Sequence, residues 1–181
     1  MDAQIKDQFE RTYERVAAGE TAHWRDSPIG RLAEVIVLDQ FARNMFRGSP
    51  RSFSADPIAL VLSQEAIRVG ADTALDEQQR KFFYMPFMHS EYKVVHEQAM
   101  KLFENSSSTK FETKHKAIID RFGRYPHRNA ILGRDPTDEE IEWMKTNSDS
   151  NDLTVSHIQI RHASEQSGMK FAFIQAGLAR P

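Results

Sequence analysis

Apolar residues recur every three or four positions over most of the first 145 residues. In the first such segment Ile5, Phe9, Tyr13 and Val16 share one helical face, and Gly19 follows where a helix would end. The same spacing recurs in three later segments: 58–69, 92–102 and 111–122. A strict alternation of apolar and polar residues persists nowhere, so the pattern predicts an all-α fold.

The segment from Ile29 to Met45 is apolar on nearly all sides. A helix of this kind is usually central and buried, and the segment is too long for a strand. Ser27-Pro28 ahead of it has the form of a cap followed by proline in the first turn. We therefore expect a buried helix over these residues, ended by the turn at 47–50.

Other boundary signals divide the rest of the chain. Asp56-Pro57 repeats the pattern of a cap followed by proline, and Asp76 is placed to cap a segment that Met85-Pro86 interrupts. Ser90 is placed to open the next helix, and Gly123 to close the one after that. A capping box over 137–140 predicts a short helix over 138–145.

Short loops between these segments favour antiparallel helical hairpins, stacked as a bundle or a short solenoid, although no repeat of fixed period is visible. We expect a single helical domain over 1–146 and a linker with a C-terminal tail over 147–181. The tail either holds a helix ending in Phe171-Ala172-Phe173-Ile174 or is an ill-ordered extension.

Composition and charge narrow the function. The 181 residues include no cysteine, which excludes disulfides, thiolate nucleophiles and cysteine-based metal sites. A formal net charge of −2 argues against binding to nucleic acid, and no apolar run is long enough to span a membrane. The polar N-terminus is unlike a signal peptide, so we expect a cytoplasmic protein. The apolar helix faces allow a homodimer without requiring one.

Charge is unevenly distributed near the end of the predicted domain. Residues 110–134 hold seven Lys and Arg against two acids, a balance of +5, and residues 135–142 hold five acids and no base. Either these are faces of consecutive helices that attract one another, or the basic segment forms a recess for an anionic ligand.

Two polar clusters interrupt the apolar pattern in the first half of the chain. In the first, Asp39, Arg43 and Arg47 are each four residues apart, as are Gln40 and Asn44. One interpretation is that these residues form ordinary pairs along one helix. The other is a polar network or a ligand site, because the residues end the most apolar segment of the chain.

The second cluster contains His89 and Glu91, a His-x-Glu pair able to ligate a metal or transfer a proton, although Ser90 is explained by capping alone.

The third cluster, 121–129, places Arg124, His127, Arg128 and Asn129 around a glycine and a proline. Arginines next to a helix N-terminus suit a carboxylate or phosphate. Alternatively, these arginines hold the acidic helix over 138–142 in place.

These motifs carry a resemblance. Asp-Gln-Phe-x-Arg-Asn at 39–44, Met-Pro-Phe-Met-His-Ser-Glu at 85–91 and Arg-Phe-Gly-Arg-Tyr-Pro-His-Arg-Asn-x-Ile-Leu-Gly-Arg at 121–134 resemble the bacterial domain-of-unknown-function family nine-two-four. The resemblance implies an all-helical, tetratricopeptide-repeat-like fold and no established reaction.

Two functions follow if the three clusters converge. The favoured one is binding of a small anionic molecule or peptide carboxylate; the alternative is a hydrolase, metal-assisted or dependent on His89, Glu91 and His127. A buried network that only joins the helices is a third interpretation. The candidate ligand-binding residues are Asp39, Arg43, Asn44, Arg47, His89, Glu91, Arg124, His127, Arg128 and Asn129.

Overall fold

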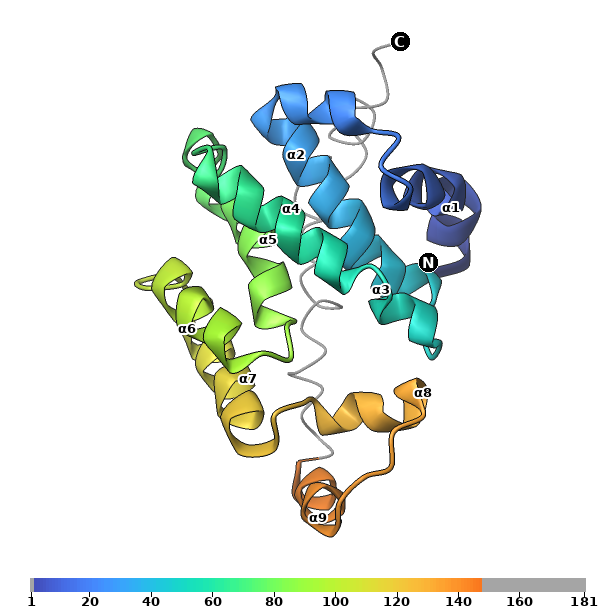
Figure 1. The fold of residues 1–181 in the computed structure, drawn as a ribbon, viewed down its shortest axis with the longest axis vertical. Helices are drawn as coiled ribbons and strands as arrows, with labels where there is room; N and C mark the ends of the chain where they lie inside the picture. Colours follow the sequence, from blue (N-terminus) through green and yellow to red (C-terminus); the bar gives the residue numbers. More distant parts are fainter. Residues whose placement is uncertain (1, 148–181) are drawn as a thin grey trace. The chain divides into compact units, whose positions relative to one another are not determined.

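The computed structural model describes residues 2–147, with side chains from residue 5 onward, and every regular element in that range is helical (Figure 1). The α-helices are α1 (Asp2–Ala17), α2 (Pro28–Val35), α3 (Ala42–Met45), α4 (Asp56–Arg68), α5 (Glu77–Met88), α6 (Lys93–Leu102), α7 (Thr109–Phe122), α8 (Asn129–Leu132) and α9 (Asp138–Thr146). The predicted all-α class is confirmed, and the predicted tail lies outside the described residues.

The long apolar helix forms where the pattern predicts it, from α2 to α3. Ser27 Oγ accepts a hydrogen bond of 3.1 Å from the Gly30 N–H, and Pro28 occupies the first turn. Between α2 and α3 the chain forms a π-helical segment, Ile36–Phe41, which the apolar pattern did not predict. A π-helical turn widens the helix by one residue, and such turns occur mainly as short insertions that are frequently functional.

The chain divides into two compact units, with the boundary between Pro86 and Phe87. The prediction of one domain over 1–146 stays a prediction. In the first unit α2 packs against α4, and α1 packs against α3 and the π-helical segment (Figure 1). Phe9 and Phe41 pack with ring centroids 4.9 Å apart in the core of this unit.

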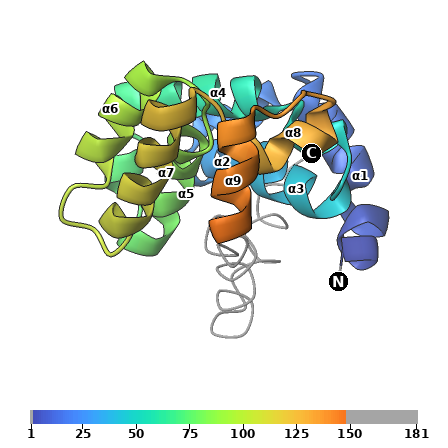
Figure 2. The ribbon, with the colours of Figure 1, turned by 90° about the horizontal axis from the view of Figure 1, so that it is seen from below.

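In the second unit α6 and α7 lie side by side, as the hairpin prediction requires (Figure 2). Gly123 ends α7 in the left-handed conformation, with φ of 69°, which favours glycine because it lacks a Cβ. Ile118, Ile119 and Tyr125 form a buried cluster, and Phe122 and Trp143 pack against it. The predicted capping box at Thr137 and Glu140 is present at the start of α9.

Three predicted boundaries were wrong. Asp56 is inside α4 rather than capping it, because its carboxylate binds Arg43. The helix expected from Ser90 begins at Lys93, so Tyr92 precedes it and is 71% exposed. Helix α5 continues through Pro86 to Met88, since a proline near a helix end removes only one backbone hydrogen bond.

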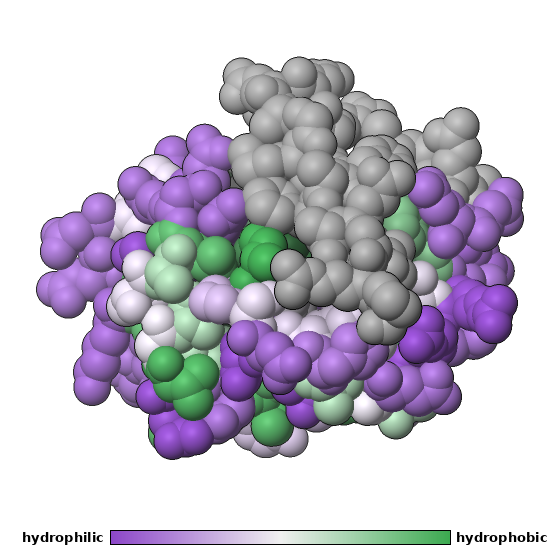
Figure 3. Space-filling view, turned by 90° about the horizontal axis from the view of Figure 1, so that it is seen from above, coloured by the Kyte–Doolittle hydropathy of each residue, from purple (hydrophilic) through white to green (hydrophobic). Residues whose placement is uncertain are grey.

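No helix between residues 2 and 147 is long and apolar enough to cross a membrane. The face of the described residues in Figure 3 is largely hydrophilic, with separate apolar areas. The exposed large apolar side chains include Val61 on α4 and Val94 on α6.

Replacement of Gly30 tests the packing at the start of α2. A Cβ at this position would lie 1.9 Å from the Trp24 carbonyl O, so backbone must move to admit it. We expect Gly30→Ala to lower the free energy of unfolding by about 3 kcal/mol, as strong overpacking does. The measurement is urea unfolding, with Ser27→Ala as the control, which loses only the cap, about 1 kcal/mol. Equal stability of Gly30→Ala and wild type would contradict this packing.

Candidate functional site

The first cluster lies in the π-helical segment and α3, within the first unit. Arg43 Nη1 lies 3.0 Å from Asp39 Oδ1, and the Arg43 guanidinium also donates two hydrogen bonds of 2.8 Å to the carboxylate of Asp56. Asp39 and Arg43 are buried. A buried charge requires partners of this kind, so these contacts explain Arg43 without a ligand.

Main-chain carbonyl oxygens of the π-helical segment accept hydrogen bonds from side chains of α3. Arg43 Nη1 donates to the Asp39 carbonyl O, and Asn44 Nδ2 donates to the Gln40 carbonyl O, both over 2.8 Å. Gln40 Nε2 donates to Asp39 Oδ2, while Gln40 Oε1 is buried and has no hydrogen-bond partner among the described residues. Arg47 is exposed, and its Nη2 lies 3.4 Å from Asn44 Oδ1. The polar side chains therefore support the widened turn.

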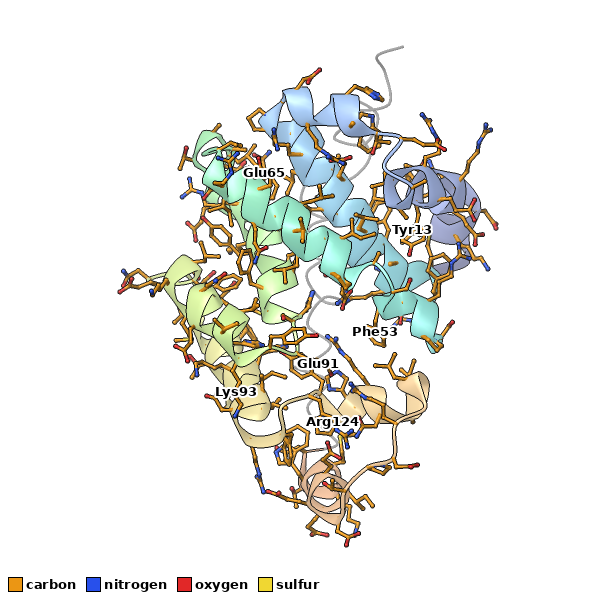
Figure 4. The ribbon with its side chains drawn as sticks, in the orientation of Figure 1. Tyr13, Phe53, Glu65, Glu91, Lys93 and Arg124 are labelled. Atoms are coloured by element: carbon orange, nitrogen blue, oxygen red, sulfur yellow. The ribbon has the colours of Figure 1, made fainter. Side chains whose placement is uncertain are left out.

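Glu91, from the second cluster and labelled in Figure 4, binds Tyr125 of the third cluster and also Arg134, which follows that cluster in the sequence. Its oxygens accept hydrogen bonds of 2.7 and 3.0 Å from the Arg134 guanidinium and one of 2.7 Å from the Tyr125 N–H. Burial by itself raises the pKa of Glu91, but these hydrogen bonds and the charge of Arg128 outweigh it and hold the pKa below its usual value. Glu91 is thus held as a carboxylate by these contacts.

Arg124 and Asn129 bind the acidic helix α9. Arg124 donates two hydrogen bonds to Glu140, of 2.6 and 2.7 Å, and Asn129 Nδ2 donates to the same carboxylate over 3.3 Å. Arg121 binds Glu139 at 2.8 Å. The hydrogen bonds from Arg124 lower the pKa of Glu140 to about 2. The interpretation that these arginines hold the acidic helix in place is confirmed for Arg121 and Arg124.

Arg128 is bound differently. Its Nη2 donates to the His89 carbonyl O over 3.0 Å, and its guanidinium carbon lies 4.6 Å from the centroid of the Tyr125 ring. The ring of His127 lies 5.4 Å from the same Tyr125 ring. Arg128 and His89 are only 6% and 8% exposed. The structure thus brings the second and third clusters together around Tyr125.

The convergence of all three clusters is confirmed only for the second and third. Asp39, Arg43, Asn44 and Arg47 belong to the first unit, and their approach to the other candidates stays a prediction. Among the described residues, no three His, Asp or Glu side chains are grouped as a metal site would need.

Two histidines that the prediction of site residues did not include, His96 and His115, also pack around Tyr125, with centroid distances of 6.3 and 5.8 Å. Burial lowers the pKa of His115 to about 3, and the nearby His89, His96 and His127 act in the same direction. His115 Nδ1 lies 2.8 Å from the Phe111 carbonyl O and donates to it in the neutral ring. In the sequence, His115 lies on an apolar helical stripe. That position predicts a buried side chain, but it does not predict contact with other histidines.

Removal of the Glu140 charge tests the arginine contacts to α9. We expect Glu140→Gln to lower the free energy of unfolding by about 3 kcal/mol at pH 7, because Arg124 loses a buried partner. Since the pKa of Glu140 is about 2, its contribution is complete above pH 4.5 and is lost as the pH falls toward 2. The control is Glu139→Gln at an exposed ion pair, which we expect to cost at most about 1 kcal/mol. Equal losses in both variants would contradict a special role for Glu140.

Protonation of His115 should destabilise the protein in acid. With a folded pKa of about 3 against 6.5 in the unfolded chain, the unfolded state binds more protons below pH 6.5. Above pH 6.5 the titration of His115 does not change the free energy of unfolding. On acidification below that value the free energy of unfolding falls, by up to about 1.4 kcal/mol per pH unit. In chemical denaturation from pH 7 to 4, His115→Gln should lose less stability than wild type. The exposed His23→Gln is the control and should follow wild type; a parallel fall in His115→Gln would be inconsistent with this assignment.

Comparisons with known proteins agree with this description of the fold. Residues 1–148 match a family model described as bacterial protein of unknown function (DUF924). A solved structure of a protein of unknown function from Agrobacterium tumefaciens is similar, with 37% identity and a TM-score of 0.77, over 80% of this chain and 84% of that one. No curated protein matches the chain significantly.

Proposed function

Because this chain belongs to DUF924, a bacterial family without an assigned function, its role has to be argued from its own residues, and we propose that it binds a small anionic ligand at Arg128. The ligand is a carboxylate or a phosphate. The residues that contact it are Arg128, His127 and His89 in the second unit.

The observation that carries the proposal is the way in which Arg128 is held. The His89 carbonyl O and the Tyr125 ring fix the guanidinium in place. A guanidinium fixed in this way is ready to form the paired hydrogen bonds that suit a carboxylate or phosphate. Preorganisation lowers the entropic cost of binding the ligand.

The surroundings of Arg128 favour an anion over a cation. His127, half-buried, and His89 both lie within electrostatic range of His115, so imidazole groups gather on this side of the unit. Each imidazole can donate a hydrogen bond to an oxyanion, and each binds an anion more strongly when protonated. An acidic partner would meet complementary charge here, whereas a basic one would be repelled.

The other candidates in the second unit have supporting roles in this proposal. Arg134 and the Tyr125 N–H hold Glu91, and Glu140 holds Arg124 and Asn129. These contacts fix the segment on either side of Arg128. Arg43 has comparable carboxylate contacts in the first unit, so the proposal assigns the first cluster to stability rather than to ligand binding.

Thermal unfolding with a panel of anions tests the proposal. We expect phosphate, acetate or citrate to raise the Tm of the wild type, by about 5 °C at 100 times the Kd of the ligand. Each variant is compared with its own ligand-free Tm, so that a change in stability alone is not counted as lost binding. Arg128→Gln should abolish the increase, and Arg128→Lys should reduce it because lysine lacks the planar fork.

The matched control is Arg121→Gln, which removes one exposed positive charge from the end of α7. It should keep the full increase in Tm. An increase that is equally lost in Arg121→Gln, or equally kept in Arg128→Gln, would show non-specific screening by salt and would refute the proposed site.

A further inference from the structure

A second polar feature of the same unit is the buried pair of His96, on α6, and Glu112, on α7. Both side chains are 0% exposed, and His96 Nδ1 lies 2.6 Å from Glu112 Oε1. The other ring nitrogen, Nε2, lies 2.8 Å from the Ser90 carbonyl O. Both nitrogens of the imidazole thus face an acceptor oxygen.

The positions of the protons follow from these contacts. A carbonyl oxygen only accepts, so Nε2 must carry a proton and donate it to Ser90. The Tyr125 hydroxyl, 3.3 Å from Nε2, does not supply a proton there, because it donates to the Met88 carbonyl O over 2.6 Å. A second proton must then lie between Nδ1 and Oε1, on one atom or the other.

We propose that the His96–Glu112 pair is a proton-linked contact between α6 and α7, which makes the closure of this hairpin sensitive to pH. The folded pair holds one dissociable proton, either as imidazolium with carboxylate or as imidazole with carboxylic acid. Both forms have zero net charge and keep both hydrogen bonds. Loss of that proton leaves a carboxylate facing a bare ring nitrogen, and gain of another leaves an unbalanced positive charge buried between the helices.

The count of protons gives the pH window. In an unfolded chain, imidazole titrates near pH 6.5 and a glutamic acid side chain near 4.3. Between these values the unfolded pair also holds one proton, so folding exchanges none. Above pH 6.5 the folded state binds more protons, and stability falls as the pH rises; below pH 4.3 the unfolded state binds more, and stability falls as the pH drops.

The environment of the carboxyl group supports retention of the proton. Glu112 Oε2 is buried and has no hydrogen-bond partner among the described residues. Burial raises the pKa of Glu112 above its usual value, even though the hydrogen bond from His96 and the charge of Lys116 oppose this change.

Three titratable groups around the pair, Lys116, Asp120 and His115, keep their charge state from pH 6.5 to 9. Lys116 forms ion pairs with Asp120 and Glu97, which raise the pKa of the lysine. The hydrogen bond from Lys116 lowers the pKa of Asp120, and burial lowers that of His115 to about 3. The remaining groups near the pair, through Tyr125 and His115, are His89, His127 and Arg128.

Glu112→Gln in the full-length chain is the decisive variant. The Gln amide can donate an N–H to His96 Nδ1 while Nε2–H still donates to Ser90, so both hydrogen bonds persist without a dissociable proton. In urea unfolding from pH 6.5 to 9, the folded-to-unfolded ratio of wild type should fall by up to about tenfold per pH unit. The ratio for Glu112→Gln should fall by much less over the same range.

The control is Glu97→Gln, also on the α6–α7 hairpin but exposed, which should keep the wild-type dependence. Nitrogen NMR of the wild-type His96 ring gives a readout that does not depend on the variant folding: at pH 8, Nε2 should carry a proton and Nδ1 should share one. An unprotonated Nε2 or Nδ1 without a shared proton, a flat wild-type ratio, or an equal dependence in Glu112→Gln would each overturn the proposal. None of these outcomes depends on anion binding at Arg128.

Discussion

The second unit is organised around Tyr125, whose polar atoms are all engaged inside the protein. Its N–H binds Glu91, its carbonyl O accepts from Arg134, and its hydroxyl donates to the Met88 carbonyl O. Its ring packs against the guanidinium of Arg128 and against the rings of three histidines. A buried polar atom without a partner lowers the stability of the protein, so all of these contacts must form at the same time. Each contact therefore restricts the positions of the residues that make the others.

This arrangement separates two uses of charge within one short stretch of chain. Arg124 and Arg134 are neutralised by Glu140 and Glu91, and they fix the segment that follows α7. Arg128 lies between them in the sequence, and its contacts include the His89 carbonyl oxygen and the aromatic face of Tyr125. The same residue type therefore serves structure at two positions and, in our proposal, recognition of an anion at the third.

The first unit uses its buried polar groups in another way. The π-helical segment inserts a residue into the most apolar helix of the chain, and the side chains of Arg43 and Asn44 bind carbonyl oxygens of this segment. Asp39 and Asp56 in turn balance the charge of Arg43. The polar end of that helix is thus explained by its own geometry.

The sequence by itself determined the helical class, most helix boundaries and the helical positions of the core residues, because period, caps and glycines act over a few neighbouring residues. Ser27, Gly123 and Thr137 perform the local roles that their patterns predict. The sequence also identified the polar clusters around Arg43, Glu91 and Arg124. Only the tertiary structure decided which arginine meets which acid, that α2 widens into a π-helical segment, and that His96 meets Glu112 across two helices. Those outcomes depend on contacts between residues far apart in the chain, whose energies no local pattern records.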